Sequence, residues 1–171
     1  QAQDGTGKAP ELAKEFVGDT PFLLTYGDIL VKPETYQQML GRWEEGEFSG
    51  LVTVTGSEDV TKGGLFFFDQ QFQLQHLVEK PSKEQLDELR VSGWIKEGEP
   101  AWYNAGIYCF TPQLFSYTAQ LQKSPRGEYE LTDALTAMLA DEHSLAGLAI
   151  AGRWVDVRDP DVLQALQPAA E

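Results

Sequence analysis

The sequence predicts an α/β domain built on a mixed, mostly parallel sheet that is flanked by helices. Helical and strand-like patterns alternate at the start of the chain, and the middle is rich in short apolar runs typical of strands. The 171 residues are 42% hydrophobic and 23% charged, an ordinary globular composition that suits one domain with a buried core. We expect this single domain to span residues 1–167, followed by a loose tail over 168–171.

The first elements alternate between helix and strand. Residues 7–16 are predicted to form a helix with Leu12, Ala13 and Phe16 on its apolar face. Residues 21–26 follow as a buried strand that ends at Gly27-Asp28. Pro33 suits the first turn of a second helix, which Gly46 closes, and residues 50–55 form the next strand.

The rest of the chain supplies further strands and helices. Predicted strands cover residues 64–69, 72–78, 104–110, 145–151 and 154–157. Predicted helices cover residues 82–90, 112–121 and 129–140, and a last helix that Asp159 caps and that ends at Leu166. The β-rich middle therefore interrupts the helix–strand alternation.

The charge and the cysteine content exclude several classes of function. Thirteen basic and 27 acidic side chains give a net charge of -14, so nucleic acid and anionic membranes are not expected partners. No apolar run approaches the ~20 residues of a membrane span. The single cysteine, Cys109, rules out an internal disulfide and is expected to be a small core residue; the cytoplasm is the expected location. The acidic excess indicates either a solubilising surface or a nucleotide-binding protein that uses a metal.

Two aspartates are predicted to follow strands. Asp28 comes after the apolar run 21–26, and Asp156 ends Trp154-Val155-Asp156. Ligands of open α/β sheets bind beyond the carboxyl ends of strands, and paired carboxylates suit Mg²⁺. Asp28 could instead cap a turn, as aspartates at strand ends often do. We expect Trp154 and Val157 to pack inward, with Asp156 on the opposite side.

Two shorter motifs add groups suited to phosphate and sugar. Lys80, in Glu79-Lys80-Pro81, is a point charge that suits a phosphate, and Glu79 can accept hydrogen bonds from sugar hydroxyls; a surface ion pair is the alternative. Gly5-Thr6-Gly7 could hold a nucleotide through backbone groups at a helix N-terminus, or could simply cap that helix. It lacks the Gly-Lys-Ser/Thr ending of the common ATPase loop.

In their order along the chain, these motifs resemble the sugar-1-phosphate nucleotidyltransferases. These enzymes, the NDP-sugar pyrophosphorylases, include glucose-1-phosphate thymidylyl and uridylyl types, and the similarity covers nearly all of the chain. It rests on Tyr26-Gly27-Asp28, Val78-Glu79-Lys80-Pro81, Asn104-Ala105-Gly106-Ile107-Tyr108, Gly127-Glu128-Tyr129-Glu130-Leu131-Thr132-Asp133 and Trp154-Val155-Asp156.

The resemblance implies a Rossmann-like fold of the nucleotide-diphospho-sugar transferase type and a role for each motif. Asp28 and Asp156 would hold Mg²⁺, and with Lys80 they would be the catalytic residues. Lys80 would bind the sugar phosphate, and the sugar pocket would be completed by Gly64, Glu79, Asn104 and Gly106. The nucleotide would contact Gly5, Thr6 and Asp28. The implied reaction is attack of a sugar 1-phosphate on the α-phosphorus of a nucleoside triphosphate, with release of pyrophosphate.

The chain departs from the family pattern in three respects. The glycine-rich N-terminal signature loop and its following lysine have no counterpart, so we expect an N-terminally incomplete domain that is inactive by itself. Gln1 falls one place short of the family's base-reading glutamine. Arg158 stands where a glycine is usual after the final aspartate, which adds bulk and charge near the expected metal.

Two other functions remain open. One is a non-catalytic regulatory or nucleotide-sugar-binding subunit of the same fold, although such a protein does not need both aspartates and Lys80. The other is a metal-using glycosyltransferase, which would normally carry two aspartates one residue apart, a pair that Asp28-Ile29-Leu30 does not supply. The sequence leaves open the base, the sugar and the formation of a homo-oligomer.

Overall fold

A computed structural model describes residues 5–56, 58–158 and 160–166. The strands are β1 (Phe22–Thr25), β2 (Ile29–Val31), β3 (Gly50–Thr55), β4 (Gly64–Phe68), β5 (Leu74–Glu79), β6 (Trp102–Phe110), β7 (Leu145–Ala149) and β8 (Trp154–Asp156). The α-helices are α1 (Lys14–Val17), α2 (Pro33–Glu44), α3 (Lys83–Val91), α4 (Leu114–Thr118), α5 (Leu131–Ala140) and α6 (Pro160–Leu166), and short 3-10 helices cover Pro10–Ala13 and Val60–Lys62.

The central sheet is mixed, as predicted, but it is not mostly parallel. Its strand order is β5-β4-β6-β3-β7, with β1 also paired to β6. Within the described residues, β3 and β7 form its one parallel pair, whereas β6 runs antiparallel to β1, β3 and β4, and β4 is antiparallel to β5. The prediction failed because a parallel pair needs a long crossover, and a short turn after β4 instead folds β5 back as a hairpin.

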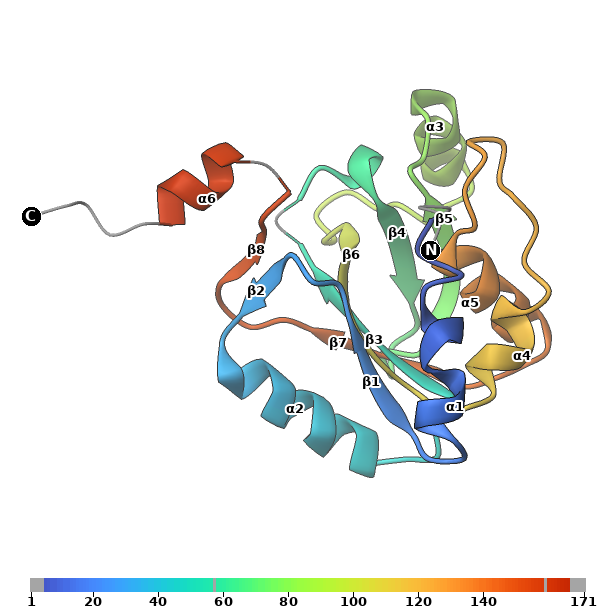
Figure 1. The fold of residues 1–171 in the computed structure, drawn as a ribbon. Helices are drawn as coiled ribbons and strands as arrows, with labels where there is room; N and C mark the ends of the chain where they lie inside the picture. Colours follow the sequence, from blue (N-terminus) through green and yellow to red (C-terminus); the bar gives the residue numbers. More distant parts are fainter. Residues whose placement is uncertain (1–4, 57, 159, 167–171) are drawn as a thin grey trace, which may run out of the picture.

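Helices cover both faces of the sheet (Figure 1). On one face, α5 buries Leu131, Leu135 and Met138 against a cluster that includes Tyr108 and Phe110 of β6. On the other face, α2 buries Met39 against Leu51, Ile107 and Cys109. Burial raises the pKa of the Cys109 thiol to about 11, so the prediction of a core cysteine is confirmed.

Strand β6 changes partner along one of its edges. β3 pairs with one edge, so β1 and β4 share the other. Residues 107–110 pair with β1, and Trp102 and Tyr103 pair with β4. Between these segments, Gly106 has a φ of 76°, a left-handed conformation that glycine tolerates, and the register of β3 shifts between Val52 and Val54. β1 and β4 therefore diverge beside Asn104–Gly106.

The predicted helix over residues 7–16 is correct only in part, since residues 10–17 are helical and residues 7–9 are not. The segment forms a turn, a 3-10 helix and the four-residue α1. Leu12 and Phe16 are 71% and 94% exposed, so the apolar face inferred from their spacing is not buried against the described chain. The sequence also missed β2, because three residues carry too little periodicity to mark a strand. The predicted cap at Asp159 and the tail over 168–171 lie outside the described residues.

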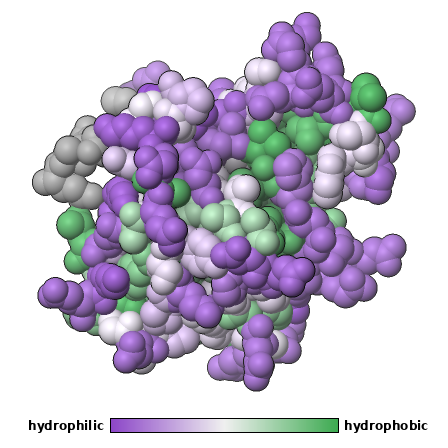
Figure 2. All heavy atoms as spheres, turned by 90° about the vertical axis from the view of Figure 1, so that its right-hand side faces the viewer, coloured by the Kyte–Doolittle hydropathy of each residue, from purple (hydrophilic) through white to green (hydrophobic). Residues whose placement is uncertain are grey.

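The outer surface is largely polar. The face that carries α4 and α5 is predominantly hydrophilic, with separated hydrophobic areas (Figure 2). Among the described residues, no helix combines the length and the apolar character needed to cross a membrane.

Candidate active site

A cavity of about 250 Å³ opens where β1 and β4 diverge along β6. We name it the strand-end cavity. Five carboxylates and three cationic side chains are among its lining residues, which are Thr6, Tyr26, Asp28, Ile29, Lys62, Gly63, Gly64, Glu79, Lys80, Tyr103, Asn104, Gly106, Glu128, Glu130, Thr132, Trp154, Asp156 and Arg158.

The cavity gathers nearly all of the residues that the sequence singled out. Strand pairing brings them together from segments up to 150 positions apart, such as Thr6 and Asp156. Gly5 is the exception, because it is described but does not line the cavity. The predicted residues that do line it are Thr6, Asp28, Gly64, Glu79, Lys80, Asn104, Gly106 and Asp156.

The two aspartates come from a small sheet outside the main one. β2 and β8 pair antiparallel, with Ile29 opposite Asp156, and the Val157 amide donates to the Asp28 carbonyl at 2.8 Å. Asp156 therefore ends β8, and Asp28 lies in the turn directly before β2, so the pairing of β2 with β8 holds the two residues next to each other. Trp154 corrects a prediction: it lies on the cavity side with Asp156, since residues two apart on a strand share a face, and its indole N–H donates to the Ala105 carbonyl at 2.9 Å.

Glu79 is held by a polar network beneath the cavity. The Thr132 hydroxyl donates to its Oε2 at 3.1 Å, and Arg126 Nη2 lies 3.6 Å from its Oε1. Burial raises the pKa of Glu79, an effect that Thr132 and Arg126 oppose. Arg126 Nη2 also lies 2.7 Å from Oε1 of the buried Glu130. Arg126 begins the run 126–133, on which the resemblance to the family also rests, but no role was predicted for it.

Lys80 adopts an unusual backbone conformation at the cavity rim. Its φ is 43°, in the left-handed region that side chains rarely adopt, and its amide donates to the Gly63 carbonyl at 2.9 Å. The neighbouring strand requires a glycine, because a Cβ on Gly64 would lie 2.8 Å from the Phe66 ring and 3.3 Å from Glu79 Oε2. Strained conformations of this kind concentrate at functional sites.

Asn104 organises the point where β6 changes partner. Its Oδ1 accepts from the Gly106 amide at 3.1 Å and from the Tyr108 hydroxyl at 2.8 Å. The Tyr108 hydroxyl also lies 3.2 Å from that of Tyr26, whose pKa burial raises. A Cβ on Gly106 would lie 2.7 Å from the Tyr26 ring. Asn104 and Gly106 therefore shape the cavity wall through internal contacts.

The Gly5-Thr6-Gly7 segment docks on the start of α5 instead of opening a helix of its own. Thr6 Oγ1 accepts from the Leu131 amide at 3.2 Å, so it caps α5, and the Gly7 amide donates to the Tyr129 carbonyl at 2.7 Å. A Cβ on Gly5 would lie 2.5 Å from the Tyr129 carbonyl oxygen. The glycines permit this close backbone approach, and Thr6 alone of the three lines the cavity.

The donor set suits a magnesium ion that shares its ligands with a substrate. Two carboxylates, one at the end of β8 and one in the turn before β2, line one cavity, and Mg²⁺ is commonly held by one or two carboxylates together with phosphate oxygens and water. The described residues contain no group of three or more His, Cys, Asp or Glu side chains placed to hold a metal by themselves. The site therefore fits a substrate-completed ion and not a closed structural metal centre.

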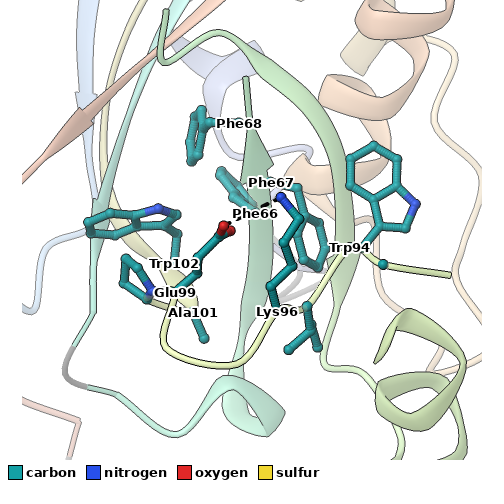
Figure 3. Close-up of a pocket in the computed structure, with 11 residues that line it drawn as sticks. Phe66, Phe67, Phe68, Trp94, Lys96, Glu99, Ala101 and Trp102 are labelled. Atoms are coloured by element: carbon teal, nitrogen blue, oxygen red, sulfur yellow. Dashed lines mark hydrogen bonds and ion pairs between the residues drawn. The ribbon is translucent and has the colours of Figure 1, made fainter. Parts of the chain in front are cut away.

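A second cavity of about 250 Å³ lies beside β4, and we name it the aromatic cavity. Figure 3 shows Phe68 and Trp102 on one side, Trp94 on the other, and the exposed Lys96–Glu99 ion pair across it, with the two charged atoms 3.4 Å apart. It contains none of the predicted site residues. Its lining residues are Phe66, Phe67, Phe68, Gly93, Trp94, Ile95, Lys96, Glu99, Pro100, Ala101 and Trp102.

Comparisons with known proteins agree with the motifs. A family model described as nucleotidyl transferase matches residues 1–170. The low-salt glycan biosynthesis nucleotidyltransferase Agl11 of Haloferax volcanii is 30% identical over 98% of this chain and 43% of its own length. The bifunctional sugar-1-phosphate nucleotidylyltransferase/acetyltransferase of Sulfurisphaera tokodaii is 31% identical over 91% of this chain and 33% of its own length.

The fold also matches a solved structure. A UDP-glucose pyrophosphorylase complexed with UDP-glucose superposes with a TM-score of 0.77, covering 95% of this chain and 60% of that one, at 19% identity. This likeness concerns the fold. By length, the chain spans 33–43% of the two curated relatives named in the preceding paragraph.

Proposed function

Because the chain belongs to the nucleotidyl transferase family, we propose that its strand-end cavity binds a nucleoside triphosphate and a sugar 1-phosphate and transfers the nucleotidyl group between them. An oxygen of the sugar phosphate attacks the α-phosphorus, and the bond to the leaving pyrophosphate breaks. The observation that carries this proposal is the meeting of Asp28, Asp156 and Lys80 at one cavity. The motifs of the family thus converge on a lysine that can neutralise phosphate charge and on two carboxylates that can hold a metal ion.

The sugar phosphate occupies the part of the cavity between β5 and β6. Lys80 supplies the cation for its phosphate, and the strained backbone of Lys80 supports a role other than stability. Glu79, oriented by Thr132 and Arg126, accepts hydrogen bonds from sugar hydroxyls. The glycines at positions 64 and 106 permit the close packing of this wall, since a Cβ there would collide with the rings of Phe66 and Tyr26.

The nucleotide lies toward Thr6 and Asp28. Asp28 and Asp156 would hold Mg²⁺, which when bound withdraws charge from the phosphates and aligns them. Phosphate transfer needs little covalent help from a protein, so positioning and charge neutralisation account for the catalysis that these side chains supply. The five carboxylates of the lining make a cation necessary, since they would otherwise repel a triphosphate.

Pyrophosphate release tests this function. The protein is incubated with Mg²⁺, glucose 1-phosphate and either UTP or dTTP, and release is compared with that of Asp28→Asn and of Asp19→Asn, an exposed acid away from the cavity. We expect release that depends on Mg²⁺ and on Asp28 and is indifferent to Asp19 from a chain that also carries the family's N-terminal signature loop. From residues 1–171 by themselves we expect nucleotide binding with the same dependences and no release. A rival, a nucleotide-sugar sensor, would instead bind UDP-glucose equally with and without Mg²⁺ in a calorimetric titration and release no pyrophosphate.

A further inference from the structure

Arg158 lies directly on the carboxylate of Asp156. Its Nη2 is 2.6 Å from Asp156 Oδ2, a short charge-assisted contact, and 3.8 Å from Glu58 Oε2. The Tyr103 hydroxyl is within hydrogen-bonding reach of the same guanidinium. The Asp156 side chain is 19% exposed and that of Arg158 35%, so water screens this pair only partly.

A cation bound to Asp156 would meet this guanidinium at close range. Because Nη2 is 2.6 Å from Oδ2 and a Mg²⁺–oxygen bond is about 2 Å long, an ion bound to Oδ2 would lie within roughly 5 Å of Nη2. Two positive charges at this distance repel each other, so they cannot share the carboxylate without cost. Glu58 offers the guanidinium a second carboxylate on its other side.

We propose that Arg158 is an internal counter-ion which occupies Asp156 in the metal-free protein and which a divalent cation must displace toward Glu58. This inference rests on the metal role of Asp156 in the proposed function. It makes Arg158 a positioning residue that lowers the affinity of the site for a free divalent ion. It also prevents the carboxylate from remaining uncompensated in a partly buried position.

The test measures the binding of Mn²⁺, which is monitored as the loss of the electron paramagnetic resonance signal of the free ion. The proteins compared are the unaltered chain, Arg158→Ala, Arg158→Lys and Lys62→Ala, each checked for folding by circular dichroism. Lys62 lines the same cavity but pairs with Asp59, at 3.9 Å, so its removal deletes one charge and leaves the Asp156 contact intact. Lysine at position 158 keeps the charge without the planar, forked donor set.

We expect Arg158→Ala to bind Mn²⁺ about three- to tenfold more tightly than the unaltered chain, tenfold being ~1.4 kcal/mol. The affinity of Lys62→Ala for Mn²⁺ should rise clearly less, and that of Arg158→Lys should lie between those of the unaltered chain and Arg158→Ala. The inference is overturned if Arg158→Ala gains no more than Lys62→Ala, or if it loses affinity for Mn²⁺ with a nucleotide, which would make Arg158 a substrate ligand.

A separate variant distinguishes failure of the inference from failure of the metal site. Asp156→Asn should weaken Mn²⁺ binding in the unaltered and the Arg158→Ala backgrounds. If it changes binding in neither, the metal role proposed for Asp156 is wrong and the inference falls with it. If it weakens binding in both while Arg158→Ala is no tighter than Lys62→Ala, the metal role stands and only the counter-ion role is rejected.

Discussion

The strand-end cavity and the aromatic cavity have the same volume, about 250 Å³ each, and different chemistry. The first is lined by eight charged side chains drawn from both ends and the middle of the chain. The second is lined mainly by aromatic rings from two neighbouring stretches, 66–68 and 93–102, with one exposed ion pair. The lining therefore distinguishes two cavities of equal size: the strand-end cavity carries charged groups that suit phosphates and a cation, whereas the aromatic cavity is lined mainly by apolar rings.

The largest effect should come from the core beside the aromatic cavity. Phe67 is 8% exposed, packs with Leu86 and Leu89 of α3, and stacks on His76 with ring centroids 5.7 Å apart. We expect Phe67→Ala to lower the free energy of unfolding by about 3–5 kcal/mol in a urea titration. Trp94→Ala, at a site that is 42% exposed, should cost less than half as much. If Phe67→Ala also weakened Mn²⁺ binding by folded molecules, the two cavities would not be independent.

Asp28→Asn tests the strand-end cavity, where we expect a loss of binding and little change in stability. Removing one carboxylate charge should lower Mn²⁺–nucleotide affinity by about 100-fold, because metal-assisted charge neutralisation is worth several kcal/mol. The melting temperature should change little, since Asp28 is exposed. A large loss of stability with intact metal binding would assign Asp28 to a turn cap.

Lys80→Gly separates binding from stability at a single residue. Loss of the ammonium should weaken sugar 1-phosphate binding by about 10- to 100-fold in a calorimetric titration. Stability should be kept or slightly raised, because glycine accepts the φ of 43° that strains lysine. Lys96→Gln, at the rim of the aromatic cavity, serves as the matched control and should leave binding unchanged. A destabilised Lys80→Gly protein would contradict this assignment of strain.

Glu79→Gln should produce the smallest effect, a change in the stability of the folded protein that depends on pH. Burial raises the pKa of Glu79 in the folded state above its ordinary value of 4.5, so folding favours the protonated acid. The stability that this group contributes is complete below pH 4.5 and is lost as pH rises through the raised pKa. The glutamine variant should therefore unfold at slightly higher urea than the unaltered protein near pH 7, with the difference vanishing below pH 4.5.

Glu128→Gln, an exposed change at the same cavity, is the control for that series. A glutamine variant at position 79 that is less stable at every pH would mean that the contacts with Thr132 and Arg126 outweigh burial.

Local patterns were sufficient for most of the secondary structure. The predicted strand over 50–55 coincides with β3, and Pro33 begins α2 as expected. Ser82 and Gln85 form a capping box at the start of α3, a pattern that lies within four consecutive residues. The predicted burial of Leu12 and Phe16 failed because periodicity indicates which side chains could be buried, and not whether a partner surface exists.

The sequence by itself determined which groups are available for the proposed site: two aspartates, a lysine between them in the chain, and glycines in the same motifs. Only the tertiary structure decided how these groups meet, through the change of partner along β6 and the pairing of β2 with β8. It also placed Arg158 on Asp156 and Arg126 beside Glu79. The physical reason is that side-chain type is a local property, whereas strand pairing and ion pairs depend on non-local packing that no short window of sequence contains.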